Sequence, residues 1–310
     1  MGTIHNLGID TGNRCIKTAN HVFVSGLKTT DTEPPFNQGV LEYGGRYHML
    51  SRHRVAYLED KTVTDEYFVL ALYGIAMELE SRGVDITCPI KVRLGVGLPP
   101  AHISRLRTRF RDYFSRGRVR FSLDMYEFVI DIVDVVVMAQ AFAAIYDDFA
   151  AVKEYTRAYI IDIGGYTTDV LLIKHGRLDP DFYQSFDMGV IGLYNQIYSN
   201  IRSQYGLSLD EDQIDAMLSN TTPVTELDEF SQIRETVSEI ADLYINDMLR
   251  RFNEYGMDIA AAKPIFAGGG AIRLLNKLEQ TGRLNRPYFI SDISANAKGY
   301  ESFLSLMNRA

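Results

Sequence analysis

The sequence is poor in cysteine and histidine, the residues that most often build disulfides and transition-metal sites. Cys15 and Cys88 are the only cysteines among 310 residues, and they lie far apart without a Cys-x-x-Cys motif. The six histidines are scattered and show no His-x-x-x-His spacing. A disulfide framework and a zinc site are therefore not supported, and a reducing, cytoplasmic location fits best.

Long apolar stretches and an excess of positive charge are also missing. No segment approaches the roughly 18 uninterrupted apolar residues of a transmembrane helix, so no membrane partner is expected. The first residues contain no basic region followed by an apolar one, which argues against a signal peptide. The formal net charge of −8 argues against direct nucleic-acid binding by the surface as a whole.

The most informative stretch is residues 159–173, in which two apolar runs flank Gly164 and Gly165. This pattern predicts two short strands joined by a tight turn. Consecutive backbone N–H groups in such a turn can form a concave anion site. Asp162 would tolerate phosphate there only with a divalent cation between them, and Mg²⁺ held through water is the natural candidate. A purely structural turn is the alternative interpretation.

A second hairpin of the same form lies near the N-terminus. Residues 7–17 place Asp10 at the end of an apolar strand, Gly12 two residues later, and then the cation Lys17. Two such hairpins, about 150 residues apart in the sequence, indicate an internal duplication in which both hairpins face one nucleotide.

Other segments predict helices and strands around these hairpins. Residues 64–82 have helical periodicity with Thr64 as the expected cap, and residues 90–98 predict a strand. Residues 263–272 predict a strand that runs into three glycines and then a helix. A base or sugar could lie against the backbone at that junction, although a simple tight turn is an equal alternative.

Two polar features are open to more than one interpretation. Residues 102–120 contain seven arginines, with Asp112 as the only acid. They predict either a basic contact surface or a solvated helix face followed by an edge strand. Gln140 lies where a strand over residues 128–137 gives way to a predicted helix, and the local sequence alone indicates a surface or capping residue there.

The order of these features resembles the superfamily of actin, sugar kinases and heat-shock chaperone ATPases. Residues 7–17 resemble its first phosphate loop and residues 133–144 its first connecting segment. Residues 160–170 resemble its second phosphate loop and residues 265–271 its adenosine motif. The resemblance spans the whole chain and implies an α/β fold, the actin-like ATPase fold, with two duplicated ribonuclease-H-like domains and a nucleotide cleft between them.

The resemblance also implies domain boundaries. Domain I would comprise residues 1–152, with an inserted subdomain at about residues 25–90, and the C-terminal helix at residues 297–310 would pack back on it. Domain II would comprise residues 153–296, with a helical insertion at about residues 205–262.

The same resemblance implies a site for ATP or ADP with Mg²⁺. Asp10 and Asp162 would hold hydrated Mg²⁺ from opposite sides, and Lys17 would neutralise phosphate charge. Gln140 matches the position that orients the attacking water in actin, whereas proteins of the ParM type have an acidic residue there, so no general-base role is expected. The phosphate contacts would be Thr11, Gly12, Asn13, Gly164, Gly165, Tyr166 and Thr167, and the adenosine contacts Gly268, Gly269 and Gly270. Asp169 is a further candidate, and ribose contacts are expected from the helix at residues 210–218.

Within the superfamily, the chain length, the Gly-Leu-Pro return at residues 97–99 and residues 295–300 resemble the plasmid-segregating ParM type of bacterial and archaeal actin-like proteins. This implies an ATPase that stacks head to tail into filaments and reaches DNA through a separate DNA-binding adaptor. The alternative is a metabolic phosphotransferase with the same ATP site, which would need a further base. A chaperone ATPase is not favoured, because the sequence lacks the peptide-binding domain of such proteins.

Overall fold

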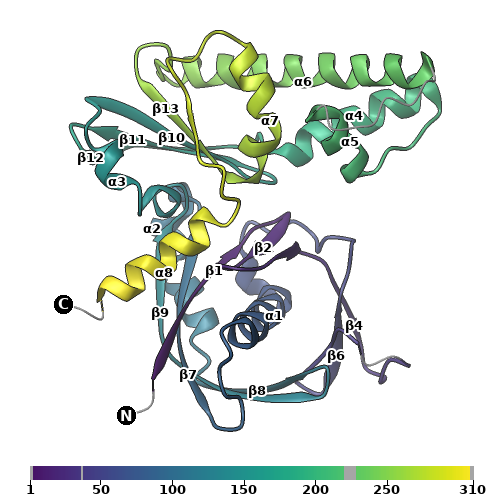
Figure 1. The fold of residues 1–310 in the computed structure, drawn as a ribbon, viewed down its shortest axis with the longest axis vertical. Helices are drawn as coiled ribbons and strands as arrows, with labels where there is room; N and C mark the ends of the chain where they lie inside the picture. The colour runs from purple at the N-terminus through teal and green to yellow at the C-terminus, as the bar shows by residue number, and fades with distance from the viewer. Residues whose placement is uncertain (1–2, 36–37, 220–227, 308–310) are drawn as a thin grey trace. The chain divides into compact units, whose positions relative to one another are not determined.

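The computed structural model describes residues 3–35, 38–219 and 228–307, and the chain divides into two compact units (Figure 1). The first unit comprises residues 1–150 and 292–310, and the second residues 151–291. Two predicted helical regions fall partly outside the described residues. These parts are residues 220–227 of the predicted helical insertion and residues 308–310 of the predicted C-terminal helix. Within the described part, no helix is both long and apolar enough to cross a membrane.

Among the described residues of the first unit, nine strands form one sheet in the order β3-β2-β1-β7-β9-β8-β5-β6-β4. β1 and β9 each pair parallel with β7, and the other neighbours pair antiparallel. The strands are β1 (Ile4–Thr11), β2 (Cys15–Lys17), β3 (Val22–Val24), β4 (Leu27–Thr30), β5 (Val40–Tyr43), β6 (Arg46–Leu50), β7 (Ile90–Leu98), β8 (Arg118–Leu123) and β9 (Tyr126–Ala139). The helices are η1 (Lys61–Val63), α1 (Glu66–Ser81), α2 (Pro100–Phe114), η2 (Ala143–Ile145) and α8 (Ala295–Met307), and α3 (Phe149–Val152) crosses into the second unit.

The core of the first unit forms around α1, and the sheet curls around this helix (Figure 1). Every residue from Tyr67 to Ala76 is buried, as expected of a helix that is apolar on all sides. The predicted cap Thr64 is wrong, because α1 begins at Glu66 with Asp65 in the N-cap position. The Thr64 hydroxyl donates instead to the side chain of Glu66, at 3.2 Å.

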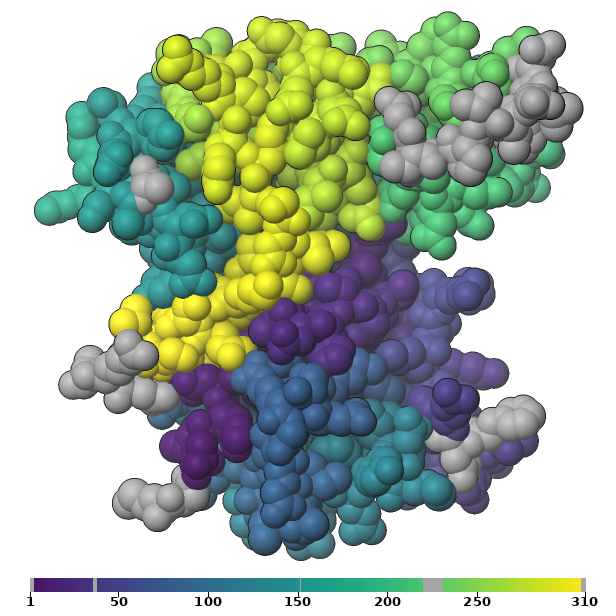
Figure 2. Space-filling model, in the orientation of Figure 1, coloured from purple at the N-terminus to yellow at the C-terminus, as the bar shows by residue number. Residues whose placement is uncertain are grey.

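The C-terminal helix α8 packs on glycines of β1 and β7. A Cβ atom added at Gly8 would lie 1.8 Å from the carbonyl oxygen of Ala297, and one at Gly97 would lie 1.7 Å from the hydroxyl of Tyr300. Only glycine therefore permits this approach of helix to sheet. In the space-filling view, the C-terminal segment lies alongside the N-terminal strand on the surface of the first unit (Figure 2).

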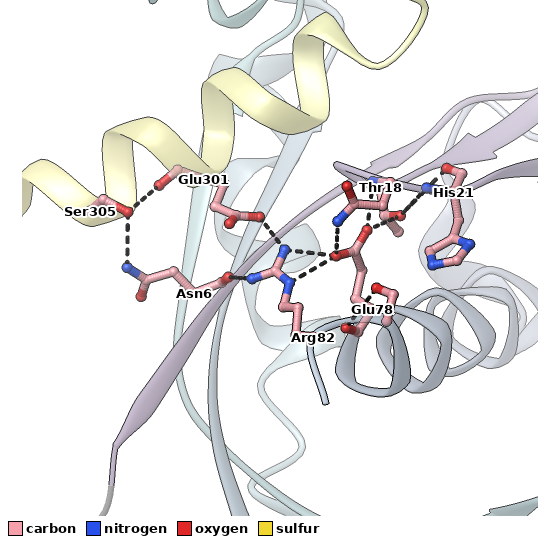
Figure 3. A network of polar contacts seen from close by, with 9 residues as sticks. Asn6, Thr18, His21, Glu78, Arg82, Glu301 and Ser305 are labelled. Atoms are coloured by element: carbon pink, nitrogen blue, oxygen red, sulfur yellow. Dashed lines mark hydrogen bonds and ion pairs between the residues drawn. The ribbon is translucent and has the colours of Figure 1, made fainter. Parts of the chain in front are cut away.

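A polar network around Glu78 connects α8 to the rest of the first unit (Figure 3). The Glu78 carboxylate is 1% exposed and accepts hydrogen bonds from the Thr18 hydroxyl at 2.6 Å and from the backbone and side chain of Asn20 at 2.7 and 2.9 Å. Arg82 donates to Glu78, to the Asn6 carbonyl of β1 at 3.0 Å, and to Glu301 of α8 at 2.8 Å. Hydrogen bonds and ion pairs of this network thus connect β1, α1 and α8, which are far apart in the sequence.

Most arginines of the basic stretch form ion pairs within the first unit. Arg105 contacts Glu59, Arg109 lies 2.8 Å from Asp60, and Arg118 lies 2.7 Å from Asp131. Arg116 lies 2.6 Å from Asp65, and its guanidinium stacks 4.0 Å above the ring of Phe68. The expected edge strand is wrong, because β8 lies inside the sheet between β9 and β5.

The second unit contains a five-stranded sheet, counted over its described residues, in the order β12-β11-β10-β13-β14. β10 pairs antiparallel with β11 and parallel with β13. The strands are β10 (Arg157–Ile163), β11 (Thr168–Lys174), β12 (Arg177–Phe186), β13 (Lys263–Ala267) and β14 (Tyr288–Phe289). The helices are α4 (Val190–Tyr205), α5 (Glu211–Leu218), α6 (Asp228–Glu254) and α7 (Gly268–Gln280).

The two sheets repeat one topology. In each, an antiparallel meander (β3-β2-β1 or β12-β11-β10) is followed by two parallel strands (β7-β9 or β13-β14). The duplicated α/β architecture predicted from the two hairpins is therefore confirmed. Each hairpin occupies the equivalent place in its own sheet.

Candidate functional site

The first hairpin brings three of the predicted site residues into contact. Asp10 at the end of β1 pairs in register with Lys17 of β2, and the Lys17 ammonium lies 2.8 Å from the Asp10 carboxylate. The amide nitrogen of Gln140 donates to the other oxygen of the same carboxylate at 3.0 Å. Asp10 is only 2% exposed, so a buried charge is balanced here by one cation and one amide.

Gln140 is held by backbone contacts that local sequence does not reveal. Its N–H donates to the Leu98 carbonyl at 2.9 Å, so β7 fixes its position. The next residue, Ala141, has a φ of +64° and donates its N–H to the side chain of Asn296 in α8, at 3.1 Å. The helix predicted from residue 140 is wrong: a turn follows β9, and then the short η2. A non-glycine residue in the left-handed region is strained, and such strain concentrates at functional sites.

The loop at residues 11–13 is fixed by side chains from three other segments. Lys61 of η1 donates to the Thr11 carbonyl, and the Ser25 hydroxyl donates to the Gly12 carbonyl at 2.5 Å. The hydroxyl of Tyr67 in α1 donates to the side chain of Asn13 at 3.0 Å. Sequence reasoning missed these three anchoring side chains, because nothing in the local pattern marks a residue that bonds to a distant carbonyl.

The second hairpin forms a turn whose carbonyl groups cap a helix. The Gly164 N–H donates to the Thr167 carbonyl at 2.8 Å, which closes the turn between β10 and β11. The carbonyls of residues 164–166 then accept hydrogen bonds of 2.9 to 3.1 Å from the N–H groups of residues 189–191, at the start of α4. The N-terminus of α4 is therefore satisfied by the turn.

Two buried side chains support this second turn. Tyr244 of α6 donates its hydroxyl to the Gly189 carbonyl at 2.8 Å, and burial raises the pKa of this phenol, so it remains a donor. Asp169 is 4% exposed and accepts hydrogen bonds from the Ser185 hydroxyl and from Thr167, the latter at 3.4 Å. The structure thus shows Asp169 contacting a residue of the turn.

The triple glycine lies against the second hairpin. α7 begins at Gly268, whose φ is +87°, and a Cβ atom there would lie 2.1 Å from a carboxylate oxygen of Asp162. Asp162 and Gly268, both predicted site residues, are therefore neighbours within the second unit. The backbone conformation and the close approach both require glycine at this position.

A polar cluster that sequence reasoning did not identify lies beside the triple glycine. Arg273 donates to the Gly269 carbonyl at 2.8 Å and to Asp215 of α5 at 2.6 Å. The hydroxyl of Tyr194 in α4 donates to the same carboxylate. Asp215 falls in the helix from which ribose contacts are expected, but its charge alone could not select it, because the same helix also carries Glu211 and Asp212.

Comparison with known proteins finds a family model that matches most of the second unit. Residues 160–280 match the family model described as archaeal actin homologue MreB-like, C-terminal. No match to the chain was found among curated proteins.

Solved structures are similar over nearly the whole chain. A ParM filament from Clostridium botulinum has a TM-score of 0.76 at 16% identity, over 98% of this chain and 100% of that chain. The actin-like protein Alp7A has a TM-score of 0.74 at 13% identity, over 99% and 98%. The archaeal actin homologue Ta0583 in complex with ADP has a TM-score of 0.72 at 16% identity, over 97% and 99%.

The repeated sheet topology, the two equivalent hairpins and these comparisons agree with one another. This chain has the actin-like fold of ParM and the archaeal actin homologues, and its second unit is similar in sequence to the C-terminal part of the MreB-like archaeal actin homologues.

Proposed function

We propose that this protein is an actin-like ATPase that assembles into filaments when it binds ATP with Mg²⁺. The observation that carries the proposal is the contact of Asp10 with both Lys17 and Gln140 at the end of β1. An acid, a cation and an amide meet there on a fold whose relatives include a protein in complex with ADP.

The residues of both hairpins fit a phosphate ligand. A Cβ atom at Gly12 would lie 2.6 Å from the Cys15 carbonyl and 3.1 Å from the Lys17 ammonium, so glycine keeps the first loop tight around its cation. Within the described residues, the Thr11 hydroxyl is buried without a hydrogen-bond partner, and a phosphate oxygen would supply one. In the second turn the carbonyls of residues 164–166 accept from α4 and the Gly164 N–H closes the turn, and we propose that the glycine backbone there lets an anion approach closely.

Asp10 and Asp162 are proposed to hold Mg²⁺ through water. The described residues contain no group of three or more histidine, cysteine or acidic side chains that could surround a metal directly. Mg²⁺ keeps several of its waters and uses few carboxylates, so two single aspartates suit it. When bound, the ion would neutralise charge on the phosphates during transfer.

Each side chain around Asp10 then has a distinct task. Gln140 uses its amide nitrogen on Asp10, so its amide oxygen is the acceptor that would orient a water molecule. An amide is not basic at neutral pH, so Gln140 positions water and does not remove its proton. Lys17 would neutralise phosphate charge while its contact with Asp10 holds it in place.

For adenosine, we propose contacts from Gly268, Gly269 and Gly270, with Asp215 as the candidate for the ribose hydroxyls. Asp215 is anchored by Arg273 and Tyr194, which also connect it to α7 and α4. A carboxylate held in this way is a suitable acceptor for sugar hydroxyls.

The filament part of the proposal rests on similarity to chains that form filaments, among them ParM from Clostridium botulinum. Head-to-tail stacking without ring closure gives an open polymer. The net charge of −8 favours a DNA-binding adaptor over direct contact with plasmid DNA.

Sedimentation and electron microscopy with ATP and Mg²⁺ test the proposal. We expect pelletable filaments with ATP and Mg²⁺, and loss of both polymer and hydrolysis when Mg²⁺ is chelated. Asp162→Ala should abolish Mg²⁺-dependent hydrolysis, whereas Asp181→Ala, at an exposed aspartate of β12, should not. ATP turnover without polymer over a broad range of protein and salt concentration would contradict the filament and favour a phosphotransferase. Undiminished turnover by Asp162→Ala would remove Asp162 from the site.

A further inference from the structure

The first phosphate loop has two consecutive peptide groups whose carbonyls are held by side chains. Lys61 bonds to the carbonyl of Thr11, and Ser25 bonds to that of Gly12 at 2.5 Å. In a trans peptide the C=O and the following N–H point in opposite directions. Fixing these two carbonyls therefore fixes the directions of the Gly12 and Asn13 N–H groups.

We propose that Lys61 and Ser25 are positioning residues of the first phosphate loop, which hold the N–H groups of Gly12 and Asn13 toward phosphate. The inference rests on the proposed function, because it assumes that this loop binds a nucleotide. Donors that are oriented before the ligand arrives bind it without a cost of reorganisation.

Ser25 is suited to this task because it is fully buried and makes two bonds to the loop. Its hydroxyl donates to Gly12, and its N–H donates to the Arg14 carbonyl at 3.0 Å. The adjacent glycine, Gly26, allows the chain to pass close to the carbonyls of Ser51 and His53. Ser25 thus stands on backbone that is itself packed in place.

Lys61 is held by contacts on both sides. Its ammonium lies 4.7 Å from the centre of the Tyr67 ring, and the Tyr67 hydroxyl bonds to Asn13. The η1 turn that carries Lys61 is capped by Asp60, which accepts from the Thr62 N–H at 3.0 Å and pairs with Arg109 of α2 at 2.8 Å. The basic helix α2 therefore supports the segment that reaches the phosphate loop.

The alternative role for Lys61 is a direct charge contact with phosphate. In that case the deficit of Lys61→Met would shrink at high ionic strength, where charges are screened. Ser25→Ala removes no charge, so a loss of nucleotide affinity in that variant reports the position of the loop. Positioning predicts that both substitutions weaken binding, and that the loss persists at high salt.

The experiment measures ATP and ADP affinity by calorimetry for the wild type, Ser25→Ala, Lys61→Met and Lys61→Arg, at low and high salt. Lys28→Met is the matched control, since Lys28 is an exposed lysine of β4 in the same unit. We expect Ser25→Ala and Lys61→Met each to bind ATP about five- to tenfold more weakly, the value of one lost hydrogen bond. Lys61→Arg, which keeps a donor, should bind more tightly than Lys61→Met, and Lys28→Met should match the wild type.

Hydrogen exchange without nucleotide provides the second readout. The peptide that contains residues 11–13 should exchange faster in Ser25→Ala and Lys61→Met than in the wild type, while peptides of the second unit keep their rates. Wild-type binding with unchanged affinity in both variants, or unchanged exchange of this peptide, would overturn the positioning role alone. A wild-type protein that binds neither ATP nor ADP would overturn the proposed function, and this inference with it.

Discussion

Replacing Glu78 by glutamine tests whether the network in Figure 3 holds the first unit together. The substitution preserves the shape of the side chain but removes the charge that Arg82 faces, and it introduces an N–H₂ group opposite existing donors. Breaking a buried ion pair by altering one partner costs about 3–5 kcal/mol. Because the Arg82 side chain is 25% exposed and keeps its contact with Glu301, we take the lower end, about 3 kcal/mol.

The expected change is large enough to measure by thermal unfolding. For a domain of 150–250 residues, about 1 kcal/mol corresponds to about 2–4 °C, so Glu78→Gln should lower the Tm of the first unit by about 6–12 °C at pH 7. Circular dichroism gives the Tm, and hydrogen exchange of peptides from the β2–β3 turn and α8 shows where the structure loosens. Glu80→Gln, an exposed neighbour on α1, is the control and should change little.

The effect should also depend on pH. Burial acts to raise the pKa of Glu78, but hydrogen bonds from Thr18, Asn20 and Arg82 outweigh it and place the pKa below its ordinary value of 4.5. A carboxylate with a lowered pKa stabilises the fold above its unfolded-state value and loses this contribution as the pH falls through the folded-state value. The Tm difference between wild type and Glu78→Gln should therefore be constant near neutral pH and shrink below about pH 4.5. An equal Tm for Glu78→Gln and Glu80→Gln at pH 7 would refute the reasoning.

Two further substitutions probe other contacts. Gly8→Ala should displace α8, because the added Cβ would overlap the Ala297 carbonyl, and limited proteolysis should then cut the C-terminal segment sooner than in the wild type. Equal cleavage rates would show that α8 does not depend on this approach. If the proposed role of Gln140 in orienting water is correct, Gln140→Ala should slow ATP hydrolysis about 100-fold while ATP affinity falls far less. Single-turnover kinetics beside Gln204→Ala, an exposed glutamine of α4, measures this, and an unchanged rate would exclude that role.

Local pattern was sufficient for the elements that carry their signal in consecutive residues. Both hairpins formed as predicted, because apolar strands on either side of an aspartate and glycine turn leave few alternatives. The strand at residues 90–98 has the predicted bounds, because prolines follow it directly. The duplication followed from comparing the hairpins, and the topology confirms it.

Long-range contacts explain what the sequence could not show. The turn after Gln140 is held by Asn296, more than 150 residues later, so a local helix pattern lost to a distant hydrogen bond. The interior position of β8 depends on its pairing with β5, a strand far earlier in the chain. Lys61 and Ser25 bond to backbone carbonyls. Every residue has a backbone carbonyl, so no residue type in the sequence marks these two partners.

The first unit is built from two separate stretches of the chain, residues 1–150 and 292–310, and this affects the order in which its parts are synthesised. The second unit is one continuous segment, and all of it is translated before α8 emerges from the ribosome. The surface of β1 and β7 that contains the glycines therefore remains uncovered by α8 while the intervening 141 residues of the second unit are synthesised. The second unit can complete its folding during translation, whereas the first can close only when the last helix arrives.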